Sequence, residues 1–359
     1  MRLDRLHITN VRNIAELELV LQPGINLFVG PNGAGKTSIL EAAYLLSHAR
    51  SFRSGGGEAL IRRGSETATV VGSIDKQNAV TTLGLSRNRQ GWQARLNQCA
   101  VPSLAVALRE FALVCFEPGS HALIGGSSLE RRSFLDWGVF HVEPEHVALA
   151  RRYRRILQQR NEALKQAAGD TEMDAWDEEL AKAGQPLNAA RQIYFRHFAD
   201  DLAKVLLLLL PELGPAAADL SSGWPDGKTL QQSLGESRGR DRGRGHTGRG
   251  PHRADWSIHF QHAPSREHLS RGQEKLCALA CVLAQATHYA RMKDDWPVIA
   301  LDDLSSELDI PHQKAVVDML LQARVQVLVS GVEVPQSLHQ AAPDLAVFHV
   351  EHGQLRGLL

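Results

Sequence analysis

A glycine-rich segment near the start of the chain carries the residue types that hold the phosphates of a nucleotide. Its glycines let successive backbone N–H groups face one anion, and the N-terminus of a following helix adds a favourable dipole. We expect Lys36 to reach the β- and γ-phosphates and the Thr37 hydroxyl to bind Mg²⁺. The residues expected to contact the nucleotide here are Gly30, Pro31, Asn32, Gly33, Ala34, Gly35, Lys36, Thr37 and Ser38.

Two carboxylates that could serve a nucleotide site with Mg²⁺ follow an apolar run late in the chain. The apolar run 298–301 ends in Asp302 and Asp303. We expect Asp302 to hold Mg²⁺ through its water shell and Asp303 to orient or deprotonate the attacking water. Two solvated acids at the end of a strand are the simpler interpretation, but the phosphate loop in the same chain disfavours it. Asp303 and Lys36 are therefore the candidate catalytic residues.

The segment Leu269–Gln273 resembles the signature motif by which ATP-binding-cassette (ABC) ATPases grip the γ-phosphate bound to a partner subunit. A serine before a helix is also an ordinary N-cap, and here the two interpretations agree, because a helix start offers its hydroxyl, N–H groups and dipole to a phosphate. Ser270, Gly272 and Gln273 are thus candidate contacts of ATP. In this architecture the motif cannot reach its own subunit's nucleotide, so it predicts an ATP-dependent homodimer.

The elements around these motifs indicate an α/β core. A short apolar strand at 25–29 leads directly into the glycine loop, and a helix over 37–46 follows it. We expect further helices from Leu269 onward and at 312–323. Further strands are expected at 3–8, 17–21, 67–74, 79–85, 92–96, 298–301 and 325–330.

The middle of the chain has a helical periodicity instead. One helix is predicted from Pro144 to about Ala168 and a second over 180–197, joined as a short antiparallel arm, with a break or kink near Gly184 and Pro186. The segment 237–253 is rich in arginine and glycine and is predicted to be a mobile basic loop.

The expected fold class is therefore α/β, an ABC-type P-loop ATPase head with an inserted helical lobe that carries a short helical-hairpin arm. We expect 1–115 plus 255–359 to form the ATPase lobe. The helical lobe, with the arm and the basic Gly/Arg loop, should span 116–254.

Composition narrows the classes of protein. In the 359 residues, Lys plus Arg and Asp plus Glu both number 40, so any surface for nucleic acid must be a local patch. No apolar run is long enough to cross a membrane, and Asp4 and Arg5 interrupt any signal peptide, so we expect a cytoplasmic protein. Cys277 and Cys281 allow a metal pair, but no second pair of ligands is nearby and buried free thiols are the simpler interpretation.

Several segments together resemble bacterial RecF, a family of recombination mediators among the SMC/Rad50-like ATPases. The resemblance covers nearly the whole chain and is weakest in the helical middle. It rests on residues 3–13, 30–37, 51–53, 131–137, 250–255, 269–273 and 302–303.

The resemblance implies an ATP-dependent DNA-binding protein for recombinational repair of gaps and stalled forks, which dimerises around two ATP molecules and hydrolyses them slowly, with stimulation by DNA. It implies action with RecO and RecR in loading recombinase, and a part in SOS induction and replication restart. Asp303 stands where most ABC ATPases carry Glu, and Ser330 where transporters carry a switch histidine, which is consistent with slow hydrolysis.

Binding to single-stranded, gapped or double-stranded DNA without sequence specificity needs arginines that contact phosphates. For the cluster at 151–155, an ordinary solvated helix face is an equal alternative. The candidates are Arg50, Arg53, Arg62, Arg63, Arg151, Arg152, Arg154 and Arg155. Two alternative functions are an ATP-gated scaffold, which is a different class of protein, and another SMC/Rad50-like ATPase whose hydrolysis is incidental.

Overall fold

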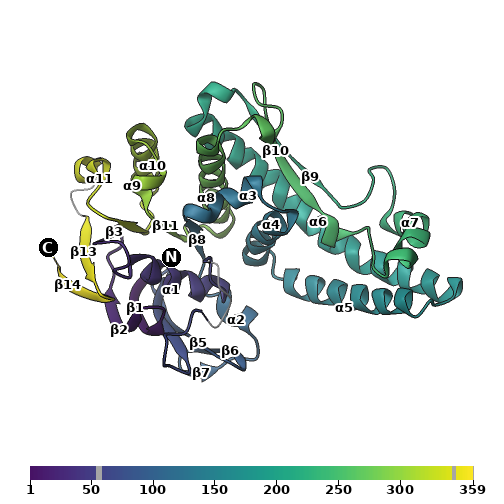
Figure 1. Ribbon diagram of the computed structural model, residues 1–359, viewed down its shortest axis with the longest axis horizontal. Helices are drawn as coiled ribbons and strands as arrows, with labels where there is room; N and C mark the ends of the chain where they lie inside the picture. Colours follow the sequence, from purple (N-terminus) through teal and green to yellow (C-terminus); the bar gives the residue numbers. More distant parts are fainter. Residues whose placement is uncertain (54–58, 342–344, 359) are drawn as a thin grey trace. The chain divides into compact units, whose positions relative to one another are not determined.

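The computed structural model describes residues 1–53, 59–341 and 345–358, and the chain divides into two compact units (Figure 1). The first unit comprises Met1–Ser120 and Ala278–Leu359, and the second His121–Cys277. The divisions expected from the sequence lie after residue 115 and after residue 254. The structure differs mainly at 255–277, a segment that contains the signature motif and that belongs to the helical unit. None of the helices in the described ranges is long and apolar enough to span a membrane.

The core of the first unit is a six-stranded sheet in the order β14-β13-β3-β12-β11-β8. Neighbouring strands are parallel except for the β13–β14 pair. Its strands are β3 (Ile25–Val29), β8 (Leu113–Phe116), β11 (Val298–Leu301), β12 (Val327–Gly331), β13 (Ala346–Glu351) and β14 (Gln354–Leu358). Every residue of β3, β11 and β12 is buried, as expected of parallel strands covered on both faces.

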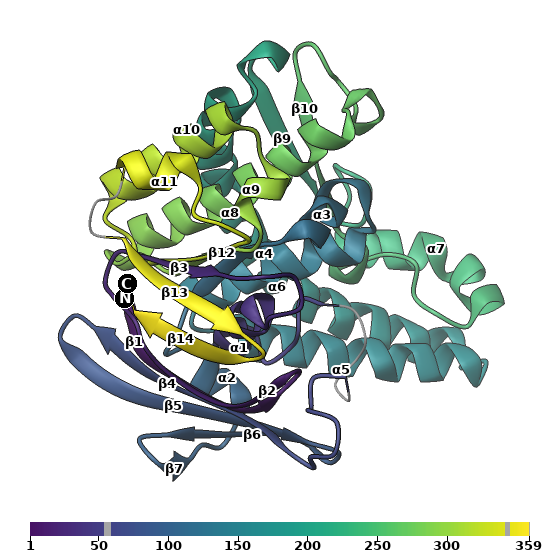
Figure 2. The ribbon, with the colours of Figure 1, turned by 60° about the vertical axis from the view of Figure 1, so that its left-hand side comes forward.

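A second, antiparallel sheet has the order β2-β1-β4-β5-β6-β7 (Figure 2). Its strands are β1 (Arg2–Val11), β2 (Ile14–Val20), β4 (Ala68–Lys76), β5 (Ala79–Asn88), β6 (Gly91–Leu96) and β7 (Cys99–Ala100). Helix α1 (Lys36–His48) contacts β1, β4 and β5 of this sheet and β8 and β12 of the other. The helix that follows the glycine loop is therefore buried between two sheets, which holds the loop rigidly.

Five further α-helices lie wholly or partly in the described residues of the first unit. They are α2 (Leu104–Leu108), α9 (Leu304–Glu307), α10 (Ile310–Ala323), α11 (Gln336–Ala341) and α8 (Arg271–Lys293), which begins in the second unit. Buried in α8 are Cys277 and Cys281, both free thiols. The predicted strands at 25–29 and 298–301 are confirmed to the residue, and the helix at 312–323 begins two residues earlier.

The second unit is mainly helical. Its elements are α3 (Ala122–Gly125), α4 (Ser128–Val142), α5 (His146–Lys165), α6 (Asp170–Leu209), α7 (Leu230–Arg244) and the antiparallel pair β9 (Ala216–Ser221) and β10 (Asp255–Phe260). Helices α5 and α6 pack side by side as the predicted arm. A break or kink was predicted in α6; the break is wrong, because one helix runs through Gly184 and Pro186, and the kink stays a prediction. A Cβ on Gly184 would lie 2.7 Å from Leu230, so this glycine serves close helix packing and not a break.

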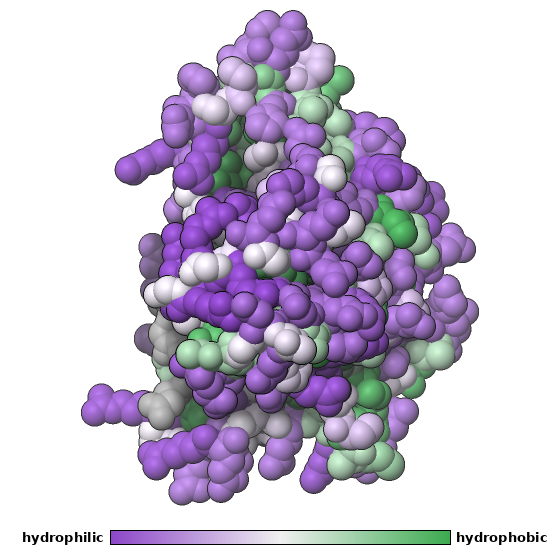
Figure 3. Space-filling view, turned by 90° about the vertical axis from the view of Figure 1, so that its right-hand side faces the viewer, coloured by the Kyte–Doolittle hydropathy of each residue, from purple (hydrophilic) through white to green (hydrophobic). Residues whose placement is uncertain are grey.

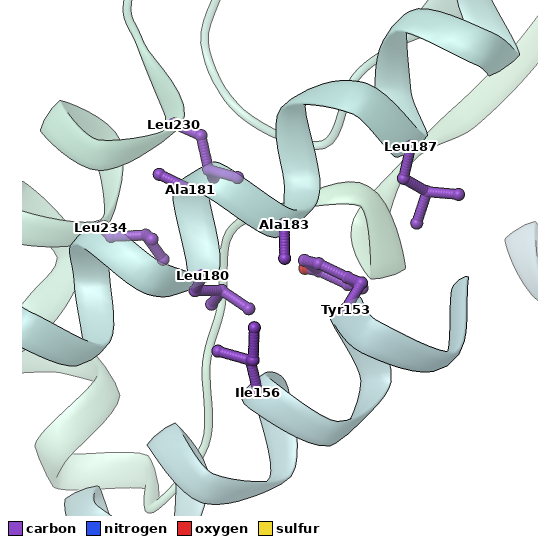
Figure 4. Close-up of a cluster of buried hydrophobic side chains, with 8 residues drawn as sticks. All are labelled: Tyr153, Ile156, Leu180, Ala181, Ala183, Leu187, Leu230 and Leu234. Carbon is purple, nitrogen blue, oxygen red and sulfur yellow. The ribbon is translucent and has the colours of Figure 1, made fainter. Parts of the chain in front are cut away.

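A cluster of buried side chains joins the three helices α5, α6 and α7 (Figure 4). Tyr153 and Ile156 come from α5, Leu180 and Leu187 from α6, and Leu234 from α7. Burial of these apolar side chains is the main contribution to holding α7 on the hairpin.

The prediction of a mobile basic loop at 237–253 is wrong for 237–244, because α7 extends through Arg244. Thr229 and Gln232 form a capping box that starts the helix. Acids of α6 then neutralise two of its arginines: Arg238 donates to Asp177 at 2.7 Å, and Arg242 donates to Asp170 at 2.8 Å. The face drawn in Figure 3 is hydrophilic for the most part, with hydrophobic side chains in smaller patches.

Candidate functional site

The phosphate loop lies between the end of β3 and the start of α1. Gly30, Gly33 and Gly35 all have positive φ, at 153°, 79° and 115°. At Gly30 a Cβ would lie 2.2 Å from the carbonyl oxygen of Val350, so no other residue fits there. The sequence therefore supplies glycine where this loop conformation requires it.

Lys36 is folded into this loop, with only 8% of its surface exposed. Its Nζ donates to the carbonyl oxygens of Gly30 at 2.8 Å and Pro31 at 3.0 Å. Burial lowers the pKa of Lys36, while the charges of Asp303 and Asp302 act in the opposite direction. The ammonium group thus lies at the loop and within the field of both carboxylates.

Two side chains, those of Thr37 and Ser330, converge on the carboxylate of Asp302, and Ser330 also binds the residue beside it. Thr37 Oγ1 donates to Asp302 Oδ1 at 3.0 Å, and Ser330 Oγ donates to the same oxygen at 2.6 Å. Burial raises the pKa of Asp302, and these two hydrogen bonds oppose the rise. The same Ser330 hydroxyl accepts the backbone N–H of Asp303 at 2.9 Å.

Asp303 has a left-handed backbone, with φ 58° and ψ 45°. Aspartate tolerates this region better than most residues do, and such strain is often found at functional sites. The bond from its N–H to Ser330 and its place as the N-cap of α9 keep it in this conformation.

These groups share one cavity of about 640 Å³, in which polar side chains dominate. The residues lining it are Arg12, Asn13, Asn32, Gly33, Gly35, Lys36, Thr37, Ser38, Arg53, Ala59, Ile61, Arg63, Pro118, Asp302, Asp303 and Ser330. A volume of this size suits a nucleotide. The structure therefore brings together the loop and both predicted carboxylates, which are far apart in the chain.

Asn13 was not among the predicted site residues, although it ends one of the segments that carry the resemblance. Its Nδ2 donates to the carbonyl of Gly33 at 3.1 Å, and its Oδ1 accepts from Ser38 Oγ at 2.9 Å. The side chain therefore links the loop to the first turn of α1.

A second missed group is the fully buried Glu41 of α1. Arg12 donates to both of its carboxylate oxygens through Nε, at 3.2 and 3.0 Å, and Ser51 donates to one of them at 2.5 Å. Arg53 lies 3.8 Å from the other oxygen. An acid among the apolar residues of a buried helix is the sequence signal that could have revealed this network, because a buried carboxylate needs a partner.

The signature motif opens α8 as a helix cap. Ser270 Oγ accepts the N–H of Gln273 at 3.3 Å, and Gln273 Oε1 accepts the N–H of Ser270 at 3.0 Å. Arg271 and Gly272 are exposed. This reciprocal capping leaves the first turn of the helix open to solvent, in the second unit of the chain.

The predicted DNA-contacting arginines fall into two sets. Arg53 and Arg63 line the nucleotide cavity, and Arg50 and Arg62 are exposed elsewhere on the first unit. The other four, Arg151, Arg152, Arg154 and Arg155, are exposed on α5. Of these, Arg152 lies 3.8 Å from Glu179. Within the described ranges, no cluster of three or more His, Cys, Asp or Glu side chains suits a metal ion.

Comparisons with known proteins agree with this architecture. The family model described as RecF/RecN/SMC N terminal domain matches residues 2–356. A DNA replication and repair protein RecF from Stenotrophomonas maltophilia is 46% identical over 361 residues, covering 99% of each chain. Its counterpart from Yersinia pestis is 35% identical over 356 residues, covering 99% of this chain and 98% of that one.

Solved structures show the same fold. A structure of the recombination mediator protein RecF with ATP, of the RecFOR pathway, has a TM-score of 0.87 at 24% identity and covers 99% of this chain and 97% of that chain. An Smc head domain from Pyrococcus furiosus has a TM-score of 0.56 at 15% identity, covering 99% of this chain and 96% of that chain. The fold is that of an ABC-type head as found in SMC proteins.

Proposed function

The chain belongs to the RecF family of DNA replication and repair proteins, and we propose that it is an ATP-dependent DNA-binding protein that dimerises around ATP and hydrolyses it slowly. The observation that carries the proposal is the convergence of Lys36, Thr37, Asp302 and Asp303 in one cavity. A solved relative in the RecFOR pathway contains ATP, which supports the same ligand here.

The residues of the cavity fit a nucleotide with Mg²⁺. The backbone N–H groups of 30–38 and the ammonium of Lys36 would hold the phosphates. Thr37 Oγ1 and Asp302 Oδ1, already 3.0 Å apart, are the oxygen donors that Mg²⁺ prefers. Bound there, the ion would neutralise charge on the β- and γ-phosphates.

Asp303 is the proposed group that orients or deprotonates the attacking water. Its backbone is held by Ser330, so the carboxylate begins from a defined position. Aspartate is one methylene shorter than the glutamate of most ABC ATPases. We therefore expect ATP to serve mainly as a dimer clamp, with hydrolysis, stimulated by DNA, resetting it.

The proposed dimer uses Ser270, Gly272 and Gln273 as contacts for the γ-phosphate on the partner subunit. The exposed start of α8, with its helix dipole, supports that role. By family membership, we propose that the dimer acts with RecO and RecR at gaps and stalled forks, loads recombinase and supports SOS induction. DNA would be bound through phosphates, without sequence readout.

Mixing two variants tests the composite site. Lys36→Ala should lose ATP binding and Ser270→Arg should bind ATP but fail to dimerise, as measured by nucleotide binding and by light scattering with ATP and Mg²⁺. A mixed dimer has one site with both defects and one with neither, so dimerisation and some turnover should return. Folded parents that stay inactive together would refute the trans arrangement.

Measuring ATP turnover distinguishes the proposed ATPase from the alternative, an ATP-gated scaffold. Asp303→Asn keeps the shape of the side chain but removes its charge, so it should give an ATP-bound dimer with little hydrolysis. Wild-type turnover stimulated by DNA favours the ATPase. DNA binding that depends on ATP without any turnover would favour the ATP-gated scaffold.

A further inference from the structure

Two segments that carry the family resemblance, 131–137 and 250–255, meet in the second unit, and the nucleotide site uses neither. Arg131 donates to both oxygens of Asp255, at 2.7 and 3.0 Å. Arg191 of α6 likewise donates to both oxygens of Asp136, at 2.7 and 2.8 Å. Each of these acids is therefore matched by one guanidinium group.

The turn at 250–253 is held on several sides. At Gly250, φ is 129°, and a Cβ there would lie 2.5 Å from the hydroxyl of Tyr153. That hydroxyl is 2.7 Å from His252 Nδ1, and His252 Nε2 is 3.0 Å from the carbonyl oxygen of Thr247. Arg191 Nη1 also donates to the carbonyl of Pro251 at 2.7 Å. The residue that follows His252 is thus presented from a rigid support.

Two arginines at this place have no ion-pair partner among the described residues. Arg132 Nη1 donates to the carbonyl of Ala254 at 2.7 Å, which places its guanidinium beside the backbone next to Arg253. The side chain of Arg253 is exposed, and that of Arg132 is partly buried. Burial lowers the pKa of Arg132; the charge of Asp255 opposes this, and those of Arg191 and Arg253 add to it. The site therefore holds two positive charges in excess of its acids.

We propose that Arg132 and Arg253 together bind a phosphate of the DNA backbone, an inference that rests on the proposed DNA-binding function. Guanidinium groups match phosphate oxygens through paired N–H donors, and a rigid turn reduces the entropy lost on binding. The exposure of Arg253 lets a polymer approach from solvent. Exposed arginines on α5 of the same unit, Arg151, Arg154 and Arg155, offer cations for further phosphates, which favours DNA over a small free anion.

The test compares Arg253→Ala and Arg132→Gln with a matched control, Arg240→Ala. Arg240 is an exposed arginine of α7 without an ion pair in the described part of the chain. Glutamine at 132 keeps an N–H donor for Ala254 while removing the charge. The affinity for fluorescently labelled double-stranded and gapped DNA is measured by anisotropy across a series of salt concentrations, with ATP binding and circular dichroism as checks of folding.

Each site variant should reduce the steepness of log affinity against log salt, by up to about 0.9 because the two arginines share one phosphate. A reduction of about 0.9 corresponds to about eightfold weaker binding near 0.1 M salt. The control should match wild type, and ATP binding should not change. Within the described residues the side chain of Arg253 makes no hydrogen bond, so Arg253→Ala should fold even if Arg132→Gln does not.

If wild type binds DNA and Arg253→Ala binds it as tightly as the control does, the proposed phosphate site is overturned, while the proposed DNA-binding function stands. A wild-type protein that binds no DNA would refute the proposed function together with the site. Inorganic phosphate, titrated directly, separates the two sources of the anion. Weaker phosphate binding with unchanged DNA affinity in the variants would assign the arginines to a free anion and overturn the proposal.

Discussion

Lowering the pH from 7.5 to 5 should weaken the second unit through one side chain, His252. Burial lowers the pKa of its ring to about 4, the charges of Arg253 and Arg132 act in the same direction, and the Thr247 carbonyl and the charge of Asp241 oppose them. Since a carbonyl only accepts hydrogen bonds, Nε2 is the donor to Thr247, and Nδ1 accepts from the hydroxyl of Tyr153. The folded protein therefore requires the neutral ring.

The magnitude follows from the two pKa values. In the unfolded chain the ring has its ordinary pKa of 6.5, and in the folded protein about 4. Because the folded pKa is lowered, the contribution to stability is complete above pH 6.5 and is lost as the pH falls toward 4. At about 1.4 kcal/mol per pH unit, the loss between pH 6.5 and pH 5 is about 2 kcal/mol.

Urea unfolding of wild type and His252→Gln at both pH values isolates this contribution from all other titrating groups. The variant should be less stable at pH 7.5, because it loses the fit between Tyr153 and Thr247, but should lose about 2 kcal/mol less than wild type on going to pH 5. Parallel pH dependences for the two proteins would refute the argument that the ring is held neutral by burial.

Three further outcomes are expected. Gly239→Ala in α7 should raise the free energy of unfolding by about 0.5–1 kcal/mol, because the helix position is exposed and a Cβ there meets nothing within 4 Å; unchanged stability in urea would contradict the helix. Arg160→Ala should cost about 3–5 kcal/mol, since it leaves two buried acids without the guanidinium that bridges them; a small loss in the same measurement would be inconsistent with that burial. Ser330→Ala should lower ATP turnover more than ATP affinity, because it frees the backbone of Asp303; equal losses, seen by nucleotide titration and phosphate release, would count against a positioning role.

The nucleotide-binding residues were accessible from the sequence because their chemistry is local. Residues 30–37 need only their own glycines and the adjacent strand and helix to face an anion, and the strand at 298–301 is a buried apolar run that ends in two acids. In contrast, the role of Ser330 appears only once β11 and β12 lie parallel and adjacent, so that the ends of both strands meet at one edge of the sheet. Glu41 likewise acquires its partners from a strand end and a loop elsewhere in the chain.

In the helical unit, by contrast, the sequence alone led to a wrong prediction. In isolation, the arginine- and glycine-rich segment 237–253 has low helix propensity and repelling charges, which is why a loop was predicted. In the folded chain, Leu234 is buried against α5 and α6, and the acids Asp177 and Asp170 neutralise Arg238 and Arg242. Motif chemistry depends on a few consecutive residues and can be predicted from them. Whether a charge is solvated, paired or left over to bind a phosphate depends on neighbours that only the tertiary structure supplies.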